Sequence, residues 1–423
     1  MCRSTVLLLA TLLVGSASSA VAEDPPAPAE VFERLMDAAR QTDSEAYAAT
    51  LAEMEGLDDG GQPALPLLRE NLRSEDPQAR AVAASALGHL ELHAEEVLPE
   101  LTALFDDTAP TPLGPVGYVA AHATAGFGRT AVPHLIEALR HEEPQVRRSA
   151  ALGVCVLGEE AQDVVPTLIE VLPEADLDTR RPFLMNALLC TGRHAKPALP
   201  LLMEYLDDED LHTQYWSCRI LGAIGPAAEP AVPKLIELVQ QGVASVRRNA
   251  AAALGKIGPG IGQEGLQVLI DALNEPMQMV REDAVIALGR LGEFAQPALP
   301  AIEEVLQEDS TFAARSQAAK SLWLLDPQSE TPPRVLLEQL QGDNEPWVAA
   351  EVLGEFAADM GVIDEVTALL DHPKSETRLY AAAILGALGK AAEHTADQVE
   401  GLLDDPDEDV REVAKQALQA LEP

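Results

Sequence analysis

Residues 244–258 read Ala244-Ser-Val-Arg-Arg-Asn-Ala-Ala-Ala-Ala-Leu-Gly-Lys-Ile-Gly258, and this stretch decides the fold. Its apolar residues recur at helical spacing, which predicts an amphipathic helix, here called helix B. The buried face of this helix should comprise Val246, Ala250, Ala253, Leu254 and Ile257. Gly258 follows the last apolar residue, at the position where a left-handed conformation commonly ends a helix.

The same pattern returns along the chain with a period of about 33 residues. It reads Met279-Val-Arg-Glu-Asp-Ala-Val-Ile-Ala-Leu-Gly-Arg-Leu-Gly292 one period later. Ahead of each arginine stands a second apolar segment. In most repeats it has a proline near its start, such as Pro233, because the first helical turn tolerates proline. We call this segment helix A. A serial array of such pairs indicates a solenoid in which each repeat stacks on its neighbours.

These repeats resemble the HEAT-repeat family, in particular HEAT-like repeats of the phycobilisome-lyase type. That signature is similar to Asp-x-x-Val-Arg-x-x-Ala-x-x-Ala-Leu-Gly-x-Ile-Gly. The resemblance implies an all-α fold, and we expect a right-handed α-solenoid of about eleven helix pairs. An N-terminal capping pair of helices should precede the array, because the first repeat would otherwise expose an apolar face. Function does not follow from this fold.

The N-terminal residues predict export. Arg3, an apolar run and Ala20-Val-Ala22 have the order of a secretory signal peptide with its cleavage site. A retained membrane anchor is the alternative, but the run is shorter than the ~20 residues that a spanning helix needs. We therefore expect an exported bacterial protein of the periplasm or the extracellular space. The expected organisation is a signal peptide at 1–22, a linker at 23–29, a helical cap at 30–58 and the solenoid at 59–423.

The net charge of the chain disfavours some classes of binding partner. Asp and Glu number 69 against 29 Lys and Arg, which gives a net charge of −40. Such a field repels nucleic-acid phosphates and anionic membrane surfaces, so we expect neither nucleic-acid binding nor membrane insertion after signal removal. The acidity is compatible with a saline habitat as well as with a cationic partner. The oligomeric state stays open.

Most repeats carry an arginine at the same position near the start of helix B. Acidic residues precede several of them in the turn, as Asp76 precedes Arg80. A guanidinium can pair with a carboxylate of its own or an adjacent turn, so we interpret the column as a structural ladder. This arginine ladder comprises Arg80, Arg147, Arg181, Arg247, Arg281, Arg315, Arg378 and Arg411.

A second set of residues lies on helix B beside its buried face. Positions such as Arg248 and Lys256 should line the inner, concave surface of a solenoid. Read through the array, these columns are rich in cations and aromatic rings, which is unexpected in so acidic a chain, and they turn acidic or neutral near its end. A binding groove and a merely neutralised surface are both compatible with this pattern. The groove residues are Tyr118, His122, Arg148, Asn186, Tyr215, Trp216, Arg219, Arg248, Lys256, Arg290 and Lys320.

The three cysteines beyond the predicted signal peptide are Cys155, Cys190 and Cys218. Cys155 and Cys190 belong to successive repeats, but their positions differ by one residue around the helix. Because free cysteine is among the most buried residue types, we favour a small apolar role in the core over a disulfide.

Catalytic motifs are not evident. His89 and His93 have the spacing of a helical metal pair, but helix B should end near Glu91, so the two need not share a face. We therefore expect no catalytic residue, no metal site and no cofactor. The favoured function is an exported, non-enzymatic scaffold that binds a protein or an extended peptide, possibly through an anionic segment, in its concave groove. The alternatives are a protein that handles a chromophore or other small ligand, as the lyase resemblance implies, and a structural module of the cell envelope.

Overall fold

The computed structural model describes residues 26–175, 183–342 and 345–421, and within them every regular element is a helix. None of the helices in these ranges is long and apolar enough to cross a membrane. The predicted signal peptide at 1–22, the start of the linker and Arg181 lie outside the described residues. The contacts divide the chain into two compact units, the first ending at Leu201 and the second beginning at Leu202.

The first unit holds a pair of helices at its start and then helices A and B in alternation. Its helices are α1 (Pro28–Gln41), α2 (Ser44–Glu55), α3 (Asp58–Gly61), α4 (Leu65–Asn71), α5 (Pro77–Leu90), α6 (Ala94–Thr102), α7 (Val116–Gly126), α8 (Val132–Leu139), α9 (Pro144–Leu157), α10 (Val165–Val171) and α12 (Met185–Cys190). Its 3-10 helices are η1 (Gln62–Ala64), η2 (Gly128–Ala131), η3 (Gly158–Val164) and η5 (Gly192–Ala198).

The second unit continues the alternation, and α13 (Leu199–Tyr205) contains the boundary. Its other helices are α14 (Leu211–Ile224), α15 (Val232–Gln241), α16 (Ala244–Ile257), α17 (Gly262–Ala272), α18 (Gln278–Arg290), α19 (Leu299–Glu308), α20 (Phe312–Leu325), α21 (Thr331–Leu340), α22 (Pro346–Phe356), α23 (Ile363–Ala368), α24 (Ser375–Leu388), α25 (Ala396–Glu400) and α26 (Glu408–Leu421). Its 3-10 helices are η6 (Gly225–Ala231), η7 (Gly258–Ile261), η8 (Gly292–Ala298), η9 (Leu369–Asp371), η10 (Gly389–Thr395) and η11 (Gly401–Asp404).

The described residues thus contain eleven successive pairs of helices, from α4 with α5 to α25 with α26. This confirms the predicted all-α solenoid. The repeat made of α15 and α16 illustrates how the sequence builds each pair. Pro233 stands in the first turn of α15, and the five predicted core residues of α16 are at most 1% exposed. Their burial against neighbouring helices supplies most of the stability of a helix this short.

The glycine after helix B differs from the expectation in one respect. Gly258 has the predicted positive φ of +83°, but its ψ is −155°, so it does not form a left-handed cap. The chain instead turns sharply and enters the 3-10 helix η7, which leads to the next helix A. Only glycine adopts this combination without strain. The connection between repeats is therefore a short helix rather than an open loop.

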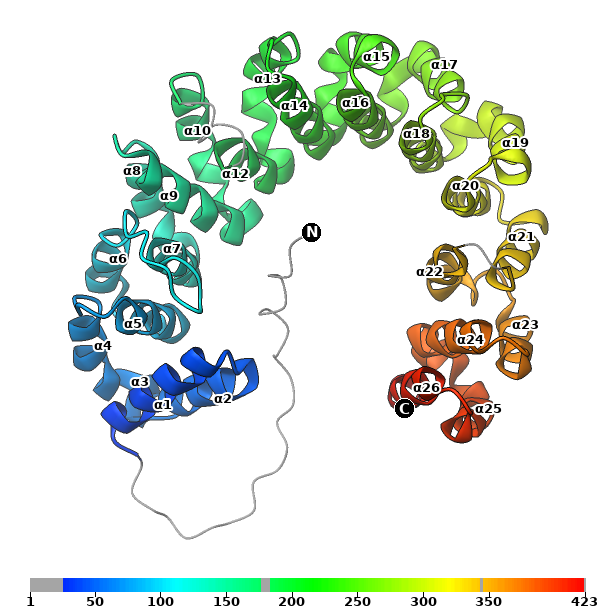
Figure 1. Cartoon of the computed structure of the whole chain (residues 1–423). Helices are drawn as coiled ribbons and strands as arrows, with labels where there is room; N and C mark the ends of the chain where they lie inside the picture. Colours follow the sequence, from blue (N-terminus) through cyan, green and yellow to red (C-terminus); the bar gives the residue numbers. More distant parts are fainter. Residues whose placement is uncertain (1–25, 176–182, 343–344, 422–423) are drawn as a thin grey trace. The chain divides into compact units, whose positions relative to one another are not determined.

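Neighbouring helices B pack closely along the second unit, and Figure 1 shows them as its inner row, with helices A as its outer row. Small residues make the approach possible. A Cβ added at Gly255 of α16 would lie 2.6 Å from the Cα of Ala287 on α18. Real side chains do not fit such a gap, so glycine is required there. This stacking brings side chains of consecutive helices B onto one inner face.

Candidate functional site

The arginine ladder is engaged in structural contacts near the turns between helices A and B. Arg281 is the clearest example, because its Nε and one terminal nitrogen donate to the carboxylate of Asp309 at 2.6 and 2.9 Å. Its other terminal nitrogen donates to the carbonyl of Glu275 at 2.9 Å. The Arg281 side chain is 12% exposed and that of Asp309 is 4% exposed. The guanidinium therefore ties the turn of its own repeat to the turn of the next one.

Other members of the ladder make related contacts. Arg378 pairs with Asp405 at 2.7 and 2.8 Å, and Arg80 pairs with Asp107 at 2.7 Å. The remaining described members donate to carbonyl oxygens that precede helix B; these are Arg147, Arg247, Arg315 and Arg411. The partner carboxylates of Arg80, Arg281 and Arg378 belong to the following repeat.

The acidic residue that precedes Arg80 in the sequence caps the helix that carries this arginine. Asp76 precedes Arg80 and accepts a hydrogen bond from the backbone N–H of Gln78 at 2.9 Å. It therefore caps the N-terminus of α5 and satisfies an amide that the helix leaves free. The sequence allowed Arg80 to pair with a carboxylate of its own or an adjacent turn, and in the structure its partner is Asp107, one repeat away.

The groove residues on α14 form an aromatic platform for a cation. The rings of Tyr215 and Trp216 meet edge to face, with centroids 5.6 Å apart. The guanidinium carbon of Arg219 lies 4.7 Å from the Trp216 centroid and 5.5 Å from the Tyr215 centroid. All three side chains are half-buried. One terminal nitrogen of Arg219 also donates to the Tyr215 hydroxyl at 3.3 Å. Cation–π attraction of this kind holds a guanidinium in place while leaving its remaining N–H donors available.

Two further cations come close to Arg219 from the next helices B. The stem of Lys256 on α16 crosses to α14, where a Cβ added at Gly222 would lie 3.2 Å from the Cδ atom of Lys256. Local desolvation lowers the pKa of Lys256, and the positive charges of Arg290 and Arg219 lower it further. Arg219, Lys256 and Arg290 therefore gather on α14, α16 and α18, and we name them the cationic cluster.

Within the part of the chain that the structure describes, no member of the cationic cluster forms an ion pair. Lys256 and Arg290 are exposed to solvent. Asp283 of α18 lies close enough to Arg290 for that positive charge to act toward lowering the pKa of Asp283. Burial outweighs that effect and raises the pKa of Asp283, which is hydrogen-bonded to Arg248 at 2.5 Å. Lys256 thus has Arg290 and Arg219 as charged neighbours, while Asp283, beside Arg290, is hydrogen-bonded to Arg248.

The other two predicted cations of this unit are neutralised. Arg248 pairs with Asp283 of α18, as just described, and another of its nitrogens lies 3.0 Å from the sulfur of Met279. Lys320 of α20 pairs with Glu355 of α22 and lies 4.9 Å from the centroid of the Phe356 ring. The contacts of Arg248 and Lys320 therefore agree with the alternative stated above, in which these cations neutralise an acidic surface.

The groove residues of the first unit form a separate set. Arg148 on α9 lies over the ring of Phe183, 5.5 Å from its centroid, and Tyr118 on α7 is 6.4 Å from the same ring. His122, also on α7, is exposed at its tip, yet desolvation by surrounding protein lowers its pKa. Asn186 on α12 donates to the sulfur of Cys155 at 3.2 Å. Here an aromatic ring rather than a cluster of cations is central.

Three contributors were missed by the sequence interpretation, namely Phe183, Asp283 and Phe356. Each contacts a predicted cation of another repeat. Asp283 occupies the helix position that Trp216 holds two repeats earlier, so comparison of one column along the chain could have revealed it. The contacts of the Phe183 and Phe356 rings could not be predicted by such a comparison, because the stacking of repeats determines which cations these rings meet.

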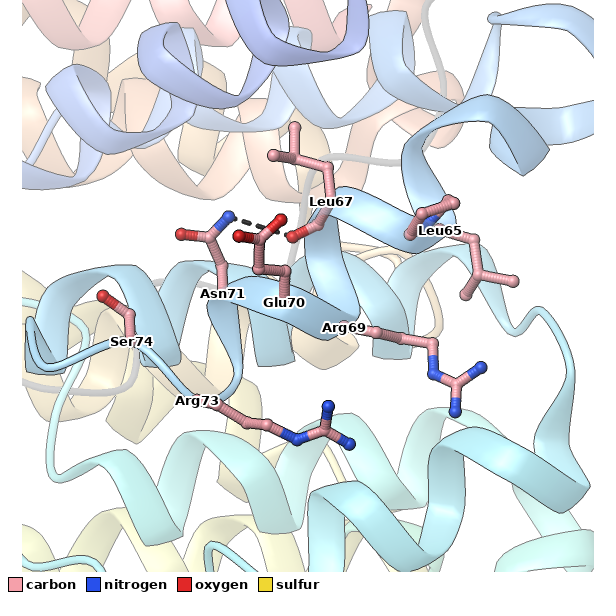
Figure 2. Close-up of a pocket in the computed structure, with 8 residues that line it drawn as sticks. Leu65, Leu67, Arg69, Glu70, Asn71, Arg73 and Ser74 are labelled. Atoms are coloured by element: carbon pink, nitrogen blue, oxygen red, sulfur yellow. Dashed lines mark hydrogen bonds between the residues drawn. The ribbon is translucent and has the colours of Figure 1, made fainter.

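A hollow beside α4 in the first unit is not a comparable site (Figure 2). Arg69 and Arg73 contribute its positive charge, and both are paired with the carboxylate of Glu100, at 3.0 and 2.7 Å. Asn71 donates to the carbonyl of Leu67 at 2.9 Å, as the dashed line shows. These groups already have partners, so they offer little to a ligand. In the three described ranges no group of three or more His, Cys, Asp or Glu side chains is placed to hold a metal ion.

Comparison with known families decides what kind of array this is. Models described as HEAT repeats match residues 183–255, 232–323 and 333–419, and a HEAT repeat model matches residues 131–161. The chain belongs to the HEAT-repeat family. The matched residues of this HEAT array include α14, α16 and α18, which carry the cationic cluster. The narrower likeness to phycobilisome-lyase repeats stays a prediction.

One solved structure shares the fold of this HEAT array at low sequence identity, and two others show a weaker likeness. A structure of importin beta is 14% identical with a TM-score of 0.51, and the match covers 93% of this chain and 62% of that one. An engineered protein is 19% identical, with a TM-score of 0.36 and coverage of 84% and 98%. A structure titled for a phosphorylation switch in the interaction of cadherin and beta-catenin is 16% identical, with a TM-score of 0.36 and coverage of 93% and 98%. No curated protein matches the sequence.

Proposed function

We propose that this HEAT array is a non-enzymatic scaffold that binds a protein partner, and that the cationic cluster with Tyr215 and Trp216 receives an extended acidic segment of it. The observation that supports the proposal is that Arg219, Lys256 and Arg290 lie close together and have no carboxylate partners among the described residues. They come together without an ion pair among the described residues, in a chain of net charge −40. Keeping like charges together costs free energy, so a compensating anion from outside is the natural complement.

The chemistry of the cluster suits carboxylates along an extended chain. Arg219 is held against Trp216 and retains N–H donors that match a carboxylate in pairs. Lys256 and Arg290 follow on the next two helices B, so acidic side chains spaced along a peptide could reach them in turn. The acidic remainder of the surface disfavours general anions by repulsion, which adds selectivity to the attraction.

We also propose that the protein is exported. Support comes from the charged start, the apolar run and Ala20-Val-Ala22 within residues 1–22. Fusion of these residues to a reporter that is active only outside the cytoplasm tests this part separately. A reporter that stays inactive while the fusion is made would contradict export without touching the binding proposal.

The binding proposal is tested with a synthetic peptide. An extended peptide of alternating Glu and Ser, and a matched peptide of alternating Gln and Ser, are titrated into the full chain while tryptophan fluorescence is recorded. The Glu peptide should bind, and binding should weaken with added salt, because exposed charges are screened over about 8 to 10 Å near physiological ionic strength. The variant Arg219→Gln with Arg290→Gln should lose at least about tenfold in affinity, or 1.4 kcal/mol.

A matched control lies on an outer helix of the same unit. Arg334 of α21 is exposed and pairs with Glu338 one turn away, so Arg334→Gln removes one positive charge outside the cluster. This variant should bind the Glu peptide as the parent does. Equal binding of the Gln peptide, full binding by the double variant, or loss of binding in Arg334→Gln would each overturn the proposed site.

A further inference from the structure

Cys155 and Cys190 meet between successive repeats of the first unit. Cys155 lies on α9 and Cys190 on α12, and the two helices pack against each other. Asn186 lies one turn before Cys190 on the same face of α12, and its amide nitrogen is 3.2 Å from the sulfur of Cys155. Both cysteines are free and half-buried, so the core role that the sequence suggested describes them less well than it describes the buried Cys218. Cys190 is also the neighbour that raises the pKa of the Cys155 thiol most, which agrees with two adjacent side chains.

We propose that Cys155 and Cys190 are a redox-active pair that forms a reversible disulfide linking two successive repeats. The co-reactant is a disulfide of low molecular mass, for which oxidised glutathione serves as the probe. Neither cysteine is fully buried, so such a molecule has access to the pair, and adjacent thiols favour ring closure over a lasting mixed disulfide. This inference is independent of the proposed peptide site in the second unit.

The order of the steps follows from the contact between the thiols. The hydrogen bond with Cys190, followed by burial and the charge on Cys190, raises the pKa of the Cys155 thiol. Because the Cys155 thiol is the one held protonated, we assign the first attack to Cys190. Its thiolate attacks one sulfur of the glutathione disulfide, the S–S bond breaks, and the departing glutathione thiolate takes up a proton.

The second step closes the ring. Cys155 releases its proton, its sulfur attacks Sγ of Cys190 in the mixed disulfide, and the second glutathione thiolate departs and takes up that proton. The two protein thiols have then lost two electrons and two protons, and one glutathione disulfide has become two molecules of glutathione. The new bond joins α9 to α12 and restricts the unfolded chain, so it should raise the thermal midpoint of the first unit.

The third cysteine provides an internal control. Cys218 on α14 is completely buried, and burial raises the pKa of its thiol to about 12. It should therefore stay reduced in the folded protein under conditions that oxidise the pair. Cys218→Ser should leave oxidation of the pair unchanged, whereas Cys155→Ser and Cys190→Ser should each abolish the internal disulfide.

The experiment uses the folded full chain in buffers with graded ratios of oxidised to reduced glutathione. After acid quenching and alkylation, peptide mass spectrometry should find Cys155 linked to Cys190, with the mass of two hydrogen atoms lost and Cys218 alkylated. The parent protein should also melt at a higher temperature when oxidised, and the two Ser variants of the pair should not show this shift. The inference fails if the pair stays reduced at every ratio. It also fails if each cysteine carries only a separate glutathione, or if the link forms only between chains or only in denaturant.

Discussion

Arg247 and Arg248 are neighbours on α16, but they belong to two different regions of the second unit. Arg247 is a member of the arginine ladder and donates to the carbonyl of Val239 at 2.8 Å. Arg248 lies on the inner face, where the cationic cluster is found two turns away at Lys256. One step along a helix rotates a side chain by about 100°, which separates the turn side of a repeat from its inner face.

The two regions differ in how their charges are satisfied. In the ladder, Arg281 and Arg378 each meet a carboxylate that is 4% exposed, together with backbone carbonyls of the turn. In the cationic cluster, Lys256 has other cations as its charged neighbours. Recurrence of arginine in a column therefore says little about its role. The partners that a cation already has distinguish a structural position from one that can receive a ligand.

The largest effect expected from this comparison is at the ladder. Replacing Arg281 by Met leaves the buried Asp309 carboxylate without its cation, so unfolding of the second unit should become easier by about 3 to 5 kcal/mol. Urea denaturation followed by circular dichroism measures this change. The control, Arg334→Met, breaks an exposed pair within α21 and should cost no more than about 1 kcal/mol. Equal losses of unfolding free energy in the two variants would mean that burial does not make the Arg281 pair more important than the exposed Arg334 pair.

Acidification should weaken the ladder. The hydrogen bonds from Arg378 hold the pKa of Asp405 below its ordinary value of 3.8. Such a group stabilises the fold fully above its unfolded-state pKa, and this contribution is lost as the pH falls through the lower folded-state value. The unfolding free energy, measured by urea titration at pH values below about 4, should therefore decrease with falling pH. Asp405→Asn should make this decrease shallower, and an unchanged slope would contradict the assignment.

The cationic cluster should contribute little to stability. Arg219→Gln and Arg290→Gln should each change the unfolding free energy by less than about 0.5 kcal/mol, as surface substitutions usually do. Leu254→Ala on the buried face of α16 provides the contrast, with an expected loss of about 2 to 5 kcal/mol through cavity formation. Both values come from urea denaturation. A loss of comparable stability in the arginine variants would mean that the cationic cluster has a structural role like that of the arginine ladder.

The smallest expected effect is on the titration of one side chain. Desolvation, Arg290 and Arg219 together lower the pKa of Lys256. Removing both arginine charges in the double Gln variant should therefore raise that pKa part of the way toward its ordinary value, since desolvation remains. A pH titration of the lysine side-chain resonances by NMR detects the change. An unaltered pKa would show that the three cations are not neighbours in solution.

Sequence periodicity predicted the fold in detail because each repeat contains its own signals. Pro233 marks the start of helix A, and the alternation of apolar and polar residues marks the buried face of helix B. The site was harder to predict. Arg219, Arg248 and Lys256 looked equivalent in the sequence. Arg248 has a carboxylate partner, whereas the other two form no ion pair with any residue that the structure describes. That difference depends on Asp283 of the next repeat, which the pattern of a single repeat does not contain.

By itself, the sequence determined the all-α array, its period and the face that each helix buries, because these follow from interactions within one repeat. Only the tertiary structure decided which side chains of successive repeats meet. It separated the paired cations from the cationic cluster and brought Cys155 and Cys190 together, although their sequence positions differ by one residue around the helix. The physical reason is that contacts between repeats depend on how helices stack, and small residues such as Gly222 and Gly255 set that approach.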